Sequence, residues 1–127
     1  MNDRYPPVAI NPTKVGAYPA LTKSGGGYFY DEVLEYRVWV HPEDGYDFCH
    51  VFARYEDAEQ FSAATRGAEK PLALVLQREW INEPEPNRFE VKRGERLTEW
   101  RIEWLKDSKR HPGSIEGFIR QRQQQES

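Results

Sequence analysis

Apolar and polar residues alternate along two neighbouring stretches of the chain, residues 33–41 (VLEYRVWVH) and residues 48–55 (FCHVFARY). Alternation of this kind, with β-branched and aromatic residues, is typical of half-buried strands. Asp44 and Gly45 lie between the stretches, and this dipeptide favours a type I′ turn, in which both central residues have positive φ. We therefore expect a β-hairpin with Asp44 and Gly45 at its centre.

The two-residue turn fixes the predicted register, because successive side chains on a strand point to opposite faces of the sheet. One face is then apolar, with the pairs Leu34–Tyr55, Tyr36–Ala53, Val38–Val51 and Val40–Cys49. The other face gathers rings and charges, in the pairs Glu35–Arg54, Arg37–Phe52, Trp39–His50 and His41–Phe48.

The rest of the chain predicts two helices and three more strands. Acidic residues begin the segment 55–65, where the helix dipole favours them, and Ala58 and Phe61 share one helical stripe. A continuous apolar run opens the segment 71–81, as in a central strand. In chain order we expect a helix (55–65), strands (71–81, 88–92 and 95–105, the last two joined at Arg93-Gly94) and a short helix after Gly113.

This element order, β-β-α-β-β-β-α, predicts an α+β fold. We expect one mostly antiparallel sheet with helices packed on one face, centred on the first and third strands. Three parts are predicted along the chain: an extended Pro/Gly-rich N-terminal arm (1–27), a single α+β domain (28–122) and a polar tail (123–127).

Composition narrows the class of protein. The 127 residues suffice for one domain, and a net charge of −3, from 18 basic and 21 acidic residues, lacks the basic excess expected of a nucleic-acid surface. The single cysteine and an N-terminal sequence unlike a signal peptide predict a cytoplasmic protein, and no apolar run is long enough to span a membrane.

The glycine triplet in LTKSGGGYFY (21–30) raises the question of phosphate binding. A phosphate loop has its glycines before the lysine and a helix after it, whereas Lys23 and Ser24 precede Gly25 to Gly27 here, and a strand follows. We expect a hinge, or an arm that lies against the sheet, with no cofactor at residues 23–27.

The spacing of histidine and cysteine residues does not favour a metal site or a nucleophilic cysteine. His41 and His50 are only diagonal neighbours in the predicted register, and no paired His or Cys spacing occurs, so we expect no metal site. Cys49 is predicted to be an unreactive core thiol. Glu99 and Glu103, on either side of Arg101, are explained by a solvated sheet face.

We predict that the polar and aromatic face of the hairpin binds a small ligand or a protein partner, which includes a second copy of the chain. Aromatic and arginine side chains concentrate in binding hot spots. The alternative is that the face is covered by residues 5–30 or by the second half of the sheet. The candidate residues are Arg37, Trp39, His41, Phe48, His50 and Phe52.

Three blocks, YPALTKSGGGYFYDEVLEYRVWVHPEDG, EKPLALVLQREWINEPEP and RLTEWRIEWL, resemble a small family of alphaproteobacterial proteins often labelled acetyltransferases of the GNAT type. The resemblance covers residues 17–105 and implies acyl transfer from acetyl-CoA to an amine. Such enzymes hold the CoA pyrophosphate in a [Q/R]-x-x-G-x-[G/A] loop at a helix N-terminus. The nearest segment, RHPGSI, has Arg110 and Gly113 in place, but Ile115 stands where Gly or Ala is needed.

Overall fold

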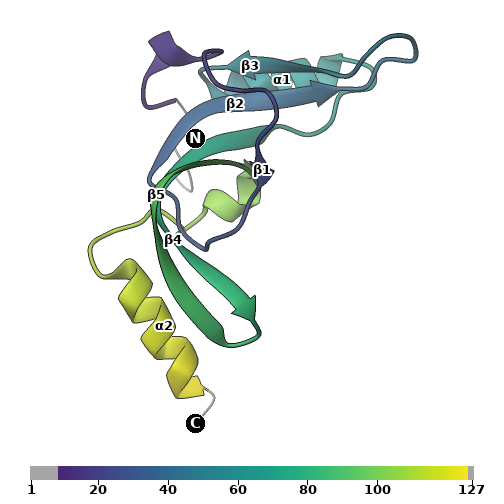
Figure 1. Cartoon of the computed structure of the whole chain (residues 1–127). Coiled ribbons are helices and arrows are strands. Elements are labelled where there is room, and N and C mark those ends of the chain that lie inside the picture. The colour runs from purple at the N-terminus through teal and green to yellow at the C-terminus, as the bar shows by residue number, and fades with distance from the viewer. Residues whose placement is uncertain (1–8, 126–127) are drawn as a thin grey trace.

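A computed structural model describes residues 9–125 and contains one five-stranded sheet in the order β1-β5-β4-β2-β3 (Figure 1). The structure combines this sheet, in which most neighbouring strands are antiparallel, with helices, so the predicted α+β fold class is confirmed. β2 and β4 are antiparallel neighbours inside the sheet, as predicted. The strands are β1 (Lys23–Ser24), β2 (Glu32–Val40), β3 (Phe48–Phe52), β4 (Leu72–Glu85) and β5 (Arg88–Arg101). The helices are α1 (Tyr55–Ala64), α2 (Ser114–Gln125) and the 3-10 turns η1 (Pro12–Lys14) and η2 (Ile102–Leu105).

The sheet buries a different set of side chains on each face. On the helix side, Tyr36, Val38 and Val40 of β2 pack in one cluster with Ala58 of α1. On the arm side, leucines of β2 and β4 pack with Tyr18 of the N-terminal arm. The N-terminal arm therefore packs on one face of the sheet, and α1 packs on the other. Residues 1–8 of the predicted arm and 126–127 of the predicted tail lie outside the described residues.

The predicted hairpin register is wrong by one residue. Val40 pairs with Phe48, Val38 with His50 and Tyr36 with Phe52. The strands are joined by residues 41–47, a loop with an odd number of residues, and only Gly45 of the Asp44-Gly45 pair has positive φ. A shift of one residue moves every β3 side chain to the other face, so Cys49 and Val51 lie on the arm side and not under α1.

Leu34 is a second correction, because it belongs to the arm-side cluster. The pairing of β2 with β4 shifts between Val33 and Glu35, and such a bulge puts one extra residue into the strand. The predicted alternation of side chains between the two faces therefore holds for Val38 and Val40 but is broken by the bulge before Glu35.

The predicted strands 88–92 and 95–105 are one strand, β5, which ends at Arg101 and continues into η2. Gly94 has φ +144° and lies at a shift in the β4–β5 register, so it forms a bulge and not a turn. Beyond Leu76, β4 pairs only with β5, and this ribbon extends from the sheet with α2 beside it (Figure 1). Within residues 9–125, no helix has the length and apolar character to cross a membrane.

Candidate functional site

The six residues predicted to form one binding face are divided between the two faces of the sheet. Arg37 and Trp39 lie on the arm side, whereas Phe48, His50 and Phe52 lie on the helix side. His41 follows the end of β2, and its ring contacts the carboxylates of Asp47 and Glu69. The one-residue shift in register is the cause of this separation, so no single surface contains the whole set.

Arg37 is fully buried and anchors the N-terminal arm. Its guanidinium donates to Glu35 at 2.6 Å and Glu99 at 2.9 Å, and also to the carbonyl oxygens of Pro19 (2.5 Å) and Ala20 (2.9 Å). Burial disfavours the charge, but the hydrogen bonds to both carboxylates outweigh it and raise the pKa of Arg37. A guanidinium with all these partners is part of the core and has little left to offer a ligand.

Phe48, His50 and Phe52 form an aromatic patch with Phe61 of α1 on the helix side. The His50 ring lies 4.4 Å from the Phe61 ring and 5.1 Å from the Phe48 ring, measured between centroids. Phe48 is 41 % exposed, and β3 is an edge strand of the sheet. This half of the predicted set is therefore accessible on the surface, and its role as an interface stays a prediction.

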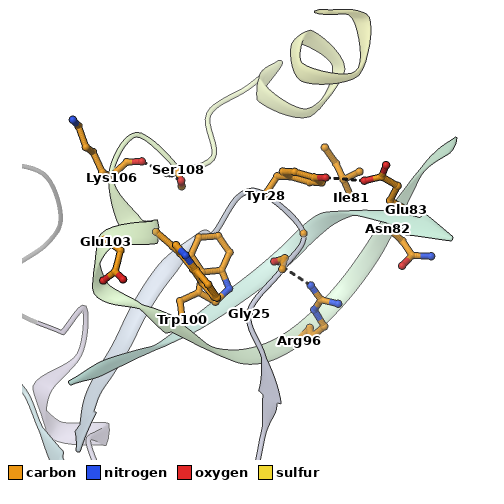
Figure 2. Close-up of a pocket in the computed structure, with 13 residues that line it drawn as sticks. Gly25, Tyr28, Ile81, Asn82, Glu83, Arg96, Trp100, Glu103, Lys106 and Ser108 are labelled. Atoms are coloured by element: carbon orange, nitrogen blue, oxygen red, sulfur yellow. Dashed lines mark hydrogen bonds between the residues drawn. The ribbon is translucent and has the colours of Figure 1, made fainter. Parts of the chain in front are cut away.

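A cavity of about 830 Å³ lies where the glycine triplet passes over the sheet (Figure 2). Its walls come from Gly25 to Tyr28, from residues 81–83 of β4, from Arg96 and Trp100 of β5, and from side chains of η2 and the turn that follows. We call this cavity the glycine-loop pocket. Cavities of about 300–1,000 Å³ are the usual size of small-molecule sites.

The glycine triplet is explained by close packing. A Cβ atom on Gly25 would lie 2.5 Å from the Trp104 ring, and a Cβ on Gly27 would lie 2.7 Å from Cβ of Trp80. Gly27 also has φ +83°, which side chains strain to adopt. The side-chain amide of Gln77 donates to the carbonyl of Gly26 at 2.8 Å and fixes the loop in place. The triplet is thus packed against the sheet and is not a loose hinge.

Arg96 lies in the pocket wall without a carboxylate partner among residues 9–125. Its guanidinium stacks on the Trp80 ring at 4.4 Å, and Nε donates to Oε1 of Gln77 at 2.9 Å. A longer contact of 3.5 Å joins it to the carbonyl of Gly26, drawn as a dashed line in Figure 2. Because burial disfavours its charge, the pKa of Arg96 is lowered from the ordinary arginine value.

Trp100 carries an unsatisfied polar group. The side chain is only 3 % exposed, and its Nε1–H has no hydrogen-bond partner in the described chain. The neighbouring ring atom, Cδ1, lies against Gly25 in the pocket wall. An unpaired buried donor costs about 1–3 kcal/mol.

The rim of the pocket is polar and aromatic. At one end the Tyr28 hydroxyl donates to Glu83 at 2.7 Å (Figure 2). The backbone N–H of Asn87, followed by that hydroxyl, lowers the pKa of the Glu83 carboxyl, which is consequently a weak proton acceptor. At the other end Trp104 is 44 % exposed and its ring centroid lies 6.3 Å from that of Trp100. The rim therefore offers an open ring beside fixed charges.

Sequence reasoning missed this pocket, although two signals pointed to it. Glu99 and Glu103 were predicted to lie on a solvated sheet face, but the Glu99 side chain is only 15 % exposed and pairs with Arg37. On the opposite face of β5 Trp100 is buried, and Trp104 follows in η2. The glycine triplet was predicted to form a hinge or an arm against the sheet, and not the wall of a pocket. Three glycines close to large rings also indicate that backbone passes directly over those rings.

The segment RHPGSI precedes α2 but does not follow a strand, because η2 and a turn separate it from β5. The Ser114 hydroxyl accepts a hydrogen bond from the backbone N–H of His111 at 2.8 Å. Within the described residues, no group of three or more His, Cys, Asp or Glu side chains is arranged to share a metal ion. Comparison of the chain with family models, curated proteins and solved structures finds no match.

Proposed function

We propose that the protein is a non-catalytic binding module that holds a small ligand with a flat ring in the glycine-loop pocket. The observation that carries the proposal is a cavity of about 830 Å³ with two features in its wall. Arg96 has no carboxylate partner among residues 9–125, and the buried Nε1–H of Trp100 has no hydrogen-bond partner there. Polar groups buried without partners are uncommon in folded proteins.

The chemistry of the wall supports binding over catalysis. The pocket contains no histidine or cysteine, and Glu83, whose pKa is lowered, is poorly suited to accept a proton near neutral pH. Tyr28 and Trp104 supply ring surface at opposite ends. Such a mixture of rings with a few fixed polar groups is typical of sites that recognise small molecules.

Indole is a suitable first probe, since it is a neutral flat ring with no group for Arg96. Line broadening of indole protons by NMR is expected with the native protein and is expected to be reduced by Trp104→Ala. Phe48→Ala is the matched control, because Phe48 is 41 % and Trp104 44 % exposed. If indole is not broadened, or if Phe48→Ala reduces the broadening as much as Trp104→Ala, the proposal is wrong.

Self-association through the aromatic patch of Phe48, His50, Phe52 and Phe61 is the second candidate function. The observation that favours it is exposed ring surface on an edge strand, with Phe48 at 41 % and the nearby Tyr46 at 95 % exposure. Edge strands pair readily with other chains unless they are protected. Sedimentation velocity tests the idea: Phe48→Ala is expected to lower the sedimentation coefficient, and a monomer for both proteins would contradict it.

A further inference from the structure

Arg96 differs from the other arginines that are not exposed. Within residues 9–125 these are Arg37, Arg96 and Arg110. Arg37 pairs with Glu35 and Glu99, and Arg110 pairs with Asp31 at 2.6 Å, whereas Arg96 has no carboxylate within ion-pair distance. Buried or half-buried charges are normally paired. Among residues 9–125, Arg96 is therefore the only one of these three arginines without a carboxylate partner.

The guanidinium of Arg96 is held ready for an anion. Stacking on Trp80 at 4.4 Å fixes its plane, and the bond from Nε to Gln77 at 2.9 Å fixes its rotation. Gln77 is itself held by the carbonyl of Phe29 at 2.7 Å and by the Thr98 hydroxyl at 3.1 Å. Among the described residues, the terminal nitrogens have only the 3.5 Å contact to Gly26. A planar fork fixed in this way matches the two oxygens of a carboxylate.

The ring surface of the pocket lies along the same strand. Arg96 and Trp100 are four residues apart on β5, which is roughly 13 Å between their Cα atoms at a rise of about 3.3 Å per residue. Trp104 follows in η2 with its ring 44 % exposed. A ligand that contacts both ends needs an anionic group and a flat ring, joined by a spacer.

We propose that the ligand of the glycine-loop pocket is an aromatic carboxylate whose carboxylate pairs with Arg96 while its ring lies against Trp104. This inference rests on the proposed function and adds the charge and the orientation of the ligand. A free acid and a peptide ending in an aromatic residue share this chemistry.

The test compares indole-3-acetate with its neutral amide, indole-3-acetamide, by ligand-observed NMR. The acid is expected to bind the native protein about tenfold to a hundredfold more tightly than the amide, which is the usual gain from a charge-assisted hydrogen bond. Arg96→Gln is expected to bring the acid to the affinity of the amide. Arg93→Gln is the matched control, because Arg93 lies on β5 but its side chain is 78 % exposed and paired with Glu79.

The outcomes separate the ligand class from the site itself. Binding of neither compound would overturn both proposals. Equal binding of acid and amide to the native protein would overturn the carboxylate inference and leave the site standing, and this comparison holds even if Arg96→Gln fails to fold. A preference for the acid that survives Arg96→Gln would also overturn it, because another cation would then hold the anion. N-acetyl-tryptophan binding more tightly than indole-3-acetate would support the same chemistry and identify a peptide terminus as its source.

Discussion

Replacing Arg37 by methionine removes the cation that joins the N-terminal arm to the sheet. Methionine has a similar length, so the change mainly deletes charge and hydrogen bonds. Glu35, which is fully buried, would keep only the bond from the backbone N–H of Gly16 at 2.8 Å. Breaking a buried ion pair from one side costs about 3–5 kcal/mol, because the remaining charge stays buried without its partner. Since a domain of this size is stable by about 5–15 kcal/mol, the loss is a large fraction of the total.

Urea unfolding followed by tryptophan fluorescence measures this loss, and a double-mutant cycle identifies its source. We expect Arg37→Met to lower the free energy of unfolding by about 3–5 kcal/mol. Glu35→Gln introduced into that variant is expected to restore part of the loss, because the buried negative charge is gone. Arg66→Met is the control, since the side chains of Arg66 and its partner Glu43 are 90 % and 78 % exposed. An Arg37→Met variant as stable as the Arg66→Met control, or strictly additive effects at positions 35 and 37, would refute the buried network.

Gly25→Ala is expected to lower the free energy of unfolding by about 1–3 kcal/mol, because the added Cβ would lie 2.5 Å from the Trp104 ring. Gly117→Ala in α2, where an added Cβ has nothing within 4 Å, is expected to stabilise the protein slightly. Thermal unfolding of both variants checks this, and equal midpoints would contradict it. Burial raises the pKa of the Cys49 thiol from 9.0 to about 11, so its thiolate at pH 8 should be roughly a hundredfold scarcer in the folded than in the urea-unfolded protein. The contribution of Cys49 to stability is then full below pH 9 and is lost as the pH rises through 11; a rate of reaction with a thiol reagent that is equal in the two states at pH 8 would contradict the shift. Calorimetry with acetyl-CoA is expected to show no saturable binding, and binding abolished by Gly113→Val would favour the acyltransferase alternative instead.

The central pair of strands in the sheet was predictable because it follows from local patterns. The apolar run in β4 and the alternation in β2 each indicate a strand, and the intervening α1 returns the chain so that β4 lies antiparallel beside β2. The register of β3 was not predictable in the same way. The register depends on whether the loop between β2 and β3 has an even or an odd number of residues. The first residue of that loop, His41, is held by a contact outside the hairpin, because its backbone N–H donates to the carbonyl of Gly67 at 2.9 Å. That partner is distant in sequence, so the Asp44-Gly45 signal alone was misleading.

The pocket could be predicted only in part, since its walls come from segments that are far apart in the chain. Gly27 and Trp80 lie close together because the glycine loop crosses the sheet. The spacing of apolar residues along the chain does not predict such a crossing. Likewise, the absence of a partner for Arg96 becomes visible only when every nearby carboxylate has been placed. The sequence did show the aromatic residues and the glycine triplet that line the pocket.

The indole N–H signals of the protein test the central claim most directly, because its four tryptophans lie in different surroundings. Trp39 donates to Glu99 at 3.0 Å on the arm side. Trp100 has no acceptor within residues 9–125, and Trp104 lies at the pocket rim. In a two-dimensional ¹H–¹⁵N spectrum, assigned with Trp→Phe variants, added indole-3-acetate is expected to move the Trp100 and Trp104 signals saturably and to leave Trp39 in place. Movement of Trp39 alone, or no movement of any indole signal, would contradict a ligand site in the glycine-loop pocket.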